Sequence, residues 1–288
     1  MGLALVLNIG TSNTTVTLPM RCVIFNGDSV EGMTFREAAL SFEMVPRIGV
    51  GREFTARRRV RLGDATPNGR LRLDAAARYL HDVSNDDTRD AAWSDGDWWV
   101  VRRTVFDVHR FPNYLEEIDL TTWCGGVGSR WAERRTQMCA LDGEVLIDAA
   151  ALWVHVDSET LMPSRVPEDV TETLTASSGG REVGAKLLLK SKLFAENRSV
   201  KEGSWPLRFS DFDVVKHMNN AAYWEMVEEH LALHTDLREP LRAIVEHIVQ
   251  VEHGQQLVRR MDDTIEDLDL QLMVGDTVHA AMWCGKTA

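Results

Sequence analysis

The chain has 288 residues, of which 32 are Lys or Arg and 44 are Asp or Glu, so its formal net charge is −12. This charge argues against nucleic acid as the main partner, and no apolar run is long enough for a membrane span. Four scattered cysteines without a CxxC pair argue against a disulfide framework or a zinc site, so we expect a protein of the reducing cytoplasm.

In chain order, residues 1–50 form an N-terminal arm whose structure the pattern does not predict. The pattern becomes regular at residue 54. Residues 54–62 alternate as a strand, and Asp74 can cap a helix that runs to about Val83. Four strands are then expected at 98–108, 116–123, 129–140 and 145–156, separated by turn signals. One helix followed by antiparallel strands predicts an α+β unit over residues 51–156, in which the sheet wraps the helix.

Residues 157–204 break this rhythm with prolines, charges and the run SSGG, which indicates an interdomain connection. The first pattern then repeats. A strand at 206–209, a loop and a helix from 220 to about 233 precede strands at 243–251, 256–261, 266–273 and 277–283. The tetrapeptide RLGD at 61–64 also returns as RFSD at 208–211. We therefore predict a tandem duplication, with the second unit over residues 205–288.

The loop before the second helix carries the candidate chemistry. Asp213 and His217 stand four residues apart, and the amides Asn219 and Asn220 follow at the start of the helix. An acid and an imidazole beside free helix N–H groups can act on a carbonyl that gains negative charge. The first loop, ATPNGRLRLD, has no such pair, which favours catalysis in the second unit alone. The alternative is structural: Asp213 and His217 form a loop hydrogen bond, and Asn220 is only an N-cap.

The run DFDVVKHMNNAAY at 211–223 resembles the active-site loop of plant and bacterial acyl-ACP thioesterases, which are tandem double-hotdog proteins. Segments at 98–108, 110–112, 117–123, 151–154 and 164–170 are also similar to their counterparts, so the resemblance covers roughly residues 54–280. It implies an N-terminal hotdog that binds the acyl chain, with the helix around 73–83 setting chain length, and a catalytic C-terminal hotdog. It also implies hydrolysis of fatty acyl-acyl-carrier-protein to free fatty acid.

Carried over residue by residue, the family's catalytic Asp and His fall on Asp213 and His217, and its catalytic Glu falls on Glu252. The chain departs from the plant pattern at two positions. Val215 stands where plant members have Asn, and His253 stands where they have Cys.

An amide near the loop could replace the missing Asn. We therefore expect Asn219, Asn220 and His253 to contact the substrate.

Thioester hydrolysis needs a water activated by a base, a polarised carbonyl and an apolar channel, and it requires no metal or cofactor. In this hypothesis Glu252 deprotonates the water, while Asp213 and His217 hold the water and the thioester. The N–H groups at the start of the 220–233 helix stabilise the oxyanion.

Several alternatives remain open. The donor could be acyl-CoA in place of the acyl carrier protein, and the chain could be an enoyl hydratase or a non-catalytic acyl-binding protein. Arginine clusters at 57–59, 102–103, 134–135 and 259–260 could dock an acidic carrier protein or simply lie on solvated strand faces. Because two fused units can complete a site within one chain, a monomer and a homodimer are both possible.

Overall fold

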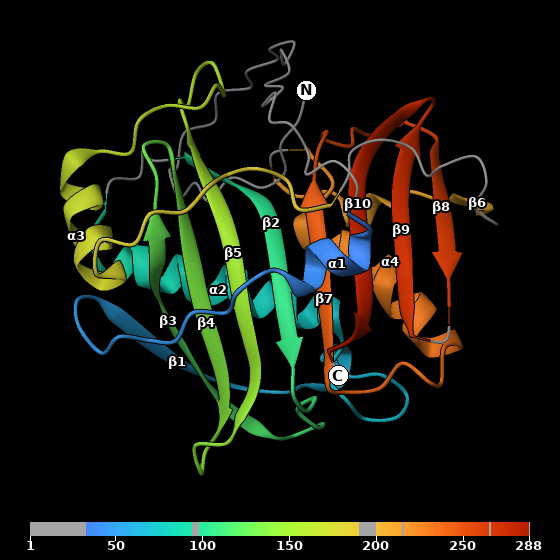
Figure 1. Cartoon of the computed structure of the whole chain (residues 1–288), viewed down its shortest axis with the longest axis horizontal. Coiled ribbons are helices and arrows are strands. Elements are labelled where there is room, and N and C mark those ends of the chain that lie inside the picture. The colour runs from blue at the N-terminus through green and yellow to red at the C-terminus, as the bar shows by residue number, and fades with distance from the viewer. Residues whose placement is uncertain (1–32, 94–97, 190–199, 215, 265, 288) are drawn as a thin grey trace.

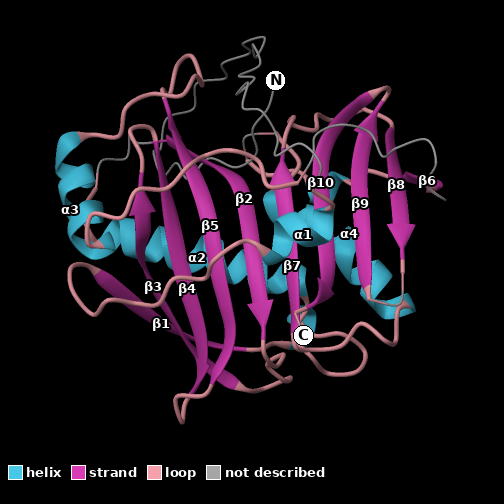
Figure 2. Ribbon diagram, in the orientation of Figure 1, coloured by secondary structure: helices cyan, strands magenta, loops and turns pink. Residues whose placement is uncertain are grey.

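The computed structural model describes residues 33–93, 98–189, 200–214, 216–264 and 266–287. Its ten described strands form one antiparallel sheet in the order β1-β3-β4-β5-β2-β7-β10-β9-β8-β6 (Figure 2). Helices α2 and α4 lie on one face of this sheet, and the short helix α1 lies on the other face (Figure 1).

The sheet is made of two halves with the same internal order. The first half contains β1 (Glu53–Arg59), α2 (Leu73–Asp90), β2 (Trp98–Val108), β3 (Glu117–Val127), β4 (Trp131–Ala140) and β5 (Val145–Val156). The second half contains β6 (Lys201–Trp205), α4 (Asn220–Leu233), β7 (Leu241–His247), β8 (Leu257–Asp263), β9 (Asp267–Val274) and β10 (Thr277–Lys286). The strands run β1-β3-β4-β5-β2 in one half and β6-β8-β9-β10-β7 in the other. The predicted α+β fold, two hotdog units each with a helix wrapped by an antiparallel sheet, is confirmed.

The predicted bounds of several elements were wrong. The expected strand at 206–209 is absent from the structure, and β6 lies at Lys201–Trp205, inside the predicted connection. Pro206 cannot donate to a ladder, whereas Lys201–Trp205 can pair with β8. Helix α2 also continues beyond Val83 to Asp90. The apolar pattern did not indicate this extension, because the buried positions there are the polar residues Ser84 and Asp87.

The predicted connection contains a helix of its own. Helix α3 (Glu168–Ser178) begins with two acidic residues in its first turn, which suits the positive end of a helix dipole, and it ends at Gly179 with φ +61°. It packs beside β3 at one end of the first half, where Val170 and Leu174 join a cluster with Cys124 and Ala132. The connection therefore closes one end of the first unit.

The two halves meet where β2 pairs with β7, which we call the seam. Val105 lies opposite Ile244 at its centre. Arg103 pairs with Glu246 on one side of this centre, and Arg242 pairs with Asp107 on the other, with an Arg242 Nη2 to Asp107 Oδ2 distance of 2.7 Å. The seam thus carries two ion pairs related by the duplication.

Each ion pair also holds a segment that has no repeat. Arg242 donates to the carbonyl oxygens of Ala39, in α1 (Phe35–Leu40), and of Phe42, just after it. The fully buried carboxylate of Glu246 accepts from the N–H groups of Leu188 and Leu189, both at 2.8 Å. The described end of the N-terminal arm and the end of the connection therefore cover the outer face of the seam.

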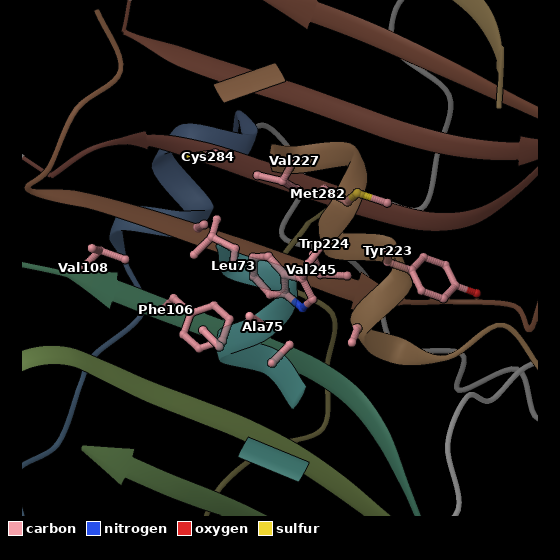
Figure 3. Close-up of a cluster of buried hydrophobic side chains, with 14 of the residues drawn as sticks. Leu73, Ala75, Phe106, Val108, Tyr223, Trp224, Val227, Val245, Met282 and Cys284 are labelled. Carbon is pink, nitrogen blue, oxygen red and sulfur yellow. The ribbon is translucent and has the colours of Figure 1, made fainter. Parts of the chain in front are cut away.

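On the inner face one apolar core crosses the seam (Figure 3). Leu73 and Phe106 of the first half pack with Trp224 and Val245 of the second half. The Phe106 and Trp224 rings meet edge to face, with centroids 4.8 Å apart. No helix among the described residues is long and apolar enough to cross a bilayer.

The shared core makes a stability prediction. Phe106 is fully buried, so Phe106→Ala should lower the free energy of unfolding by about 3–5 kcal/mol, as expected for a cavity that cannot collapse. Urea unfolding followed by circular dichroism measures the loss. Phe209→Ala is the matched control, because Phe209 is 92% exposed and its removal should change stability by about 0.5 kcal/mol or less. Equal effects of the two variants would contradict a core shared across the seam.

Candidate active site

The Asp213 to His217 loop is a tight turn with a fixed backbone. The Asp213 N–H donates to the His217 carbonyl at 3.0 Å, and the Lys216 N–H donates to the Asp213 carbonyl at 2.9 Å. Lys216 has φ +66°, a conformation that costs energy for a residue with a side chain. The buried carboxylate of Asp211 accepts from the Arg208 N–H, and its carbonyl accepts from the Asn219 N–H at 2.7 Å. The loop is therefore held at both ends, and Val215 lies outside the described residues.

Glu252 lies directly opposite His217. The two residues form an isolated antiparallel bridge, and the neighbouring Met218 N–H donates to the Val251 carbonyl at 3.1 Å. This arrangement makes His217 and Glu252 a non-hydrogen-bonded pair, in which Cα atoms are about 4.5 Å apart and side chains share one face. Asp213 Oδ1 accepts from the His217 N–H at 3.4 Å. The structure thus brings the three predicted catalytic residues together.

The charge state of His217 follows from its surroundings. Burial lowers the pKa of its imidazole to about 4. The ring is therefore neutral at pH 7, with one nitrogen able to donate and the other able to accept a hydrogen bond. Its Nδ1 atom is enclosed and has no hydrogen-bond partner among the described residues. His217 can consequently position a water or a thioester as a neutral group.

The two asparagines have different roles. Asn219 is the N-cap of α4, since its side chain accepts from the Ala221 N–H at 2.9 Å. Asn220, which the sequence suggested as a possible cap, is instead the first helical residue. Its side chain is 2% exposed, and its amide oxygen and nitrogen have no partner among the described residues. Asn220 is thus free to bind a ligand, whereas the Asn219 side chain is already engaged.

His253 lies at the edge of the loop. Its ring is exposed and stacks at a tilt on Phe212, with centroids 5.3 Å apart. Its predicted contact with the substrate stays a prediction.

The first half repeats the same backbone frame without the reactive groups. Arg70 forms a bridge with Asn113, as His217 does with Glu252. Gly69 has φ +87° at the position of Lys216, and Thr66 takes the place of Asp213, since its N–H donates to the Arg70 carbonyl at 2.8 Å. Both halves therefore have the same backbone frame, but only the second half carries the reactive side chains, Asp213, His217 and Glu252.

A carboxylate fills the helix start of the first frame. The Leu73 N–H, at the beginning of α2, donates to Oε1 of Glu228 at 2.6 Å. Arg70 holds the same carboxylate through two hydrogen bonds of 2.9 Å. Glu228 comes from α4, so the second half closes the frame of the first. At the start of α4 no described residue accepts from the Asn220 N–H in this way.

A pocket of about 570 Å³, part of it open to solvent, lies in the first half. Its lining is aromatic and polar: Trp93, Trp99, Trp123, Trp153, Cys124, Ala132, Leu174, Arg52, Asp87, Thr88, Glu133, Arg134, Thr173 and Ser177. Asp87 and Thr88, near the end of α2, line it, whereas the region 73–83 that the resemblance implicated does not. The helical part of the lining therefore comes from the later part of α2 and from α3.

Contacts between aromatic side chains link the lining of the pocket to the seam. Trp153 lines the pocket and meets His81 of α2 edge to face, with centroids 5.9 Å apart. His81 lies close enough to His247 at the end of β7 to influence its pKa. His247 in turn packs on Tyr223 of α4. Sequence reasoning missed both His81 and His247, and the one available signal was the repeat itself, which aligns His81 with Glu228.

The arginine clusters are largely paired within the chain. Arg57, Arg58 and Arg59 bind Asp119, Asp86 and Glu117, and Arg260 binds Glu202. Arg103 and Arg134 are also paired, and Arg102 and Arg135 are buried. These clusters therefore offer little uncompensated positive charge to an acidic partner, which favours the structural alternative.

The chain is similar to known proteins over most of its length. Residues 51–174 match the family model for the acyl-ACP thioesterase N-terminal domain, and residues 195–279 match the model for its C-terminal domain. An uncharacterized protein of Mycobacterium tuberculosis is 30% identical over 239 residues, which is 83% of this chain and 94% of that protein. The chloroplastic acyl-[acyl-carrier-protein] hydrolase FATB3 of Cuphea viscosissima is 30% identical over 131 residues, 43% of this chain and 31% of that one.

Two solved structures show the same fold. The 12:0-ACP thioesterase from Umbellularia californica gives a TM-score of 0.64 at 17% identity, over 81% of this chain and 96% of that one. An acyl-ACP thioesterase from Bacteroides thetaiotaomicron gives 0.66 at 15% identity, over 88% and 99%. Fold and family models together define a thioester hydrolase. The chain belongs to the acyl-ACP thioesterase family.

The filled frame of the first half makes a second prediction. Glu228→Ala would leave Arg70 and the Leu73 N–H without their carboxylate, so we expect a loss of about 3 kcal/mol in the free energy of unfolding. Glu229→Ala, at the exposed neighbouring position, should change it by about 0.5 kcal/mol or less. Urea unfolding of both variants measures the difference. Similar stabilities would show that the carboxylate contributes nothing.

Proposed function

We propose that Asp213, His217 and Glu252 catalyse hydrolysis of a fatty acyl thioester of the acyl carrier protein. The observation that carries this proposal is the His217 and Glu252 pair beside the start of α4. It places a carboxylate, a neutral imidazole and an open helix N-terminus in one small region.

In this mechanism Glu252 takes a proton from a water, and the water oxygen attacks the thioester carbonyl carbon. Glu252 suits this role because its side chain is exposed and its backbone is held, with the N–H donating to Oε1 of Gln255 at 2.9 Å. His217 and Asp213 orient the water and the thioester. The base contributes on the order of 10²–10⁴ in rate.

The carbonyl oxygen becomes negative during the attack. The Asn220 N–H and the positive end of the α4 dipole stabilise this oxyanion, since the Asn219 side chain already occupies the Ala221 N–H. When the tetrahedral intermediate collapses, the carbon–sulfur bond breaks and the proton passes to the leaving thiolate. The products are a free fatty acid and the thiol of the carrier protein, and no metal or cofactor takes part.

The two halves have separate tasks in this proposal. We assign acyl-chain binding to the N-terminal unit, residues 51–156, because it holds the pocket. We assign catalysis to the C-terminal unit, residues 205–288 together with β6. Since both parts of the site lie in one chain, we expect an active monomer, with a homodimer as the alternative. The described cysteines, Cys124, Cys139 and Cys284, are free thiols, in keeping with a cytoplasmic location.

Kinetic variants test the catalytic roles. Glu252→Gln and Asp213→Asn keep the shape of each side chain but remove a carboxylate, so kcat should fall by about 10²–10⁴. Steady-state hydrolysis of an acyl-acyl-carrier-protein measures this fall. Glu229→Gln, an exposed carboxylate farther along α4, should leave kcat unchanged. Near-normal turnover in both site variants would end the assignment.

A charge change in the exposed part of the Asp213 to His217 loop tests whether the acyl group is delivered by the carrier protein or by CoA. Lys216 is exposed, and its positive charge can attract the acidic carrier protein during encounter. Lys216→Glu should therefore raise KM for the carrier-protein substrate by about tenfold at low salt, and less for the same acyl group on CoA. Lys186→Glu, an exposed position on the connection, is the matched control. Equal KM changes for both donors would count against the carrier protein.

A further inference from the structure

Several polar groups near the seam are buried without hydrogen-bond partners. His247, at the end of β7, is 4% exposed, and neither of its ring nitrogens has a partner among the described residues. The same holds for both amide atoms of Asn220, and for the indole nitrogen of Trp153, whose side chain is 4% exposed. These three groups come from α4, β5 and β7, on both sides of the seam.

The groups lie along one route through the interior. His247 packs on Tyr223 edge to face, with centroids 4.7 Å apart. Tyr223 follows Asn220 by three residues, so it lies about one turn further along the same side of α4. His81, whose charge would affect His247, contacts Trp153, and Trp153 lines the pocket of the first half. Neighbouring side chains therefore lead from the start of α4 to Trp153 in the lining of the pocket.

An unfunctionalised acyl chain would not suit this route. A buried polar group without a hydrogen bond costs free energy, and each such group in a native protein requires an explanation. A saturated chain would cover His247 and Trp153 with methylene groups and leave their nitrogens unpaired. An oxygen on the chain would satisfy them.

The hydrogen-bonding capacity of the His247 ring determines which type of oxygen group it can bind. Burial lowers the pKa of His247 to about 3, so the ring is neutral, with one nitrogen as donor and the other as acceptor. A hydroxyl group can use both nitrogens, and a keto oxygen can accept from one. Tyr223 lies about one helical turn from Asn220 and packs on His247, so we expect this oxygen to lie near the thioester end of the chain.

We propose that the preferred substrate carries a hydroxyl or keto oxygen near its thioester end, and that the unpartnered nitrogens of His247 and Trp153 bind it. The inference rests on the proposed thioester hydrolysis and names the acyl class. In this arrangement Asn220 holds the thioester end, and the rest of the chain enters the pocket.

A substrate panel tests the acyl class directly. Carrier-protein thioesters of one chain length are compared as the saturated, the 3-hydroxy and the 3-oxo acyl forms. The wild-type enzyme should hydrolyse at least one oxygenated form with kcat/KM about tenfold or more above the saturated form, because unpaired site groups reject the analogue that lacks the oxygen. Equal or better hydrolysis of the saturated form would overturn the inference and leave the proposed function standing. Hydrolysis of none of the three would contradict the proposed function itself.

Variants then assign the contact. His247→Phe should bring the ratio of oxygenated to saturated kcat/KM to about one, mainly by lowering the oxygenated value. His230→Phe is the matched control, because His230 is also a buried histidine of the second half but lies near the far end of α4, beside Arg259. It should keep the wild-type ratio.

Thermal unfolding shows whether each variant is folded. If His247→Phe does not fold, Trp153→Phe removes a single donor and should lower the same ratio. An unchanged ratio in a folded His247→Phe enzyme would exclude His247 as the ligand.

Discussion

The antiparallel pairing of β2 with β7 is the contact on which the rest of this structure depends. It joins two five-stranded halves into one sheet and brings α2 and α4 together on the inner face. Phe106 and Trp224 can meet only because this pairing exists. The same pairing joins the half that carries the Asp213 loop to the half that holds the pocket.

Duplication followed by divergence explains why only one frame is reactive. Both halves keep the same turn, the same bridge and a residue with positive φ, so the backbone requirement is shared. The difference lies in the residue of α4 that faces the start of α2. Glu228 meets α2 as a permanent carboxylate held by Arg70, while the aligned position on α2 is His81. A negative charge developing at a substrate carbonyl would therefore find the α2 start already occupied and the α4 start open.

Much of the fold could be predicted because its signals are local. The helix at Asn220–Leu233 and the strands at Trp98–Val108 and Val145–Val156 have the predicted bounds. β6 was missed because its sequence, KEGSW, has a weak strand pattern and gains its stability by pairing with β8. The paired arginines of β1 were ambiguous for a related reason, since their acidic partners lie on β3 and α2. The candidate site also has residues that a local pattern indicates and residues that only the fold brings together. Asp213 and His217 belong to one loop, so their spacing alone could indicate chemistry. His247 and Trp153 come from β7 and β5 in different halves, so no local spacing relates them.

Unpaired polar groups in an otherwise apolar interior reduce stability unless a bound molecule or an ordered water pairs them. If the site bound only alkyl chains, an aliphatic residue of similar size in place of His247 would increase the stability of the protein. No described residue forms a hydrogen bond with the ring nitrogens of His247. The same reasoning does not apply to Glu246 one position earlier, whose buried charge is satisfied by two backbone N–H groups and Arg103. Adjacent residues of β7 thus show two kinds of buried polarity. The one facing outward holds the fold together, and the one facing inward is left for a ligand.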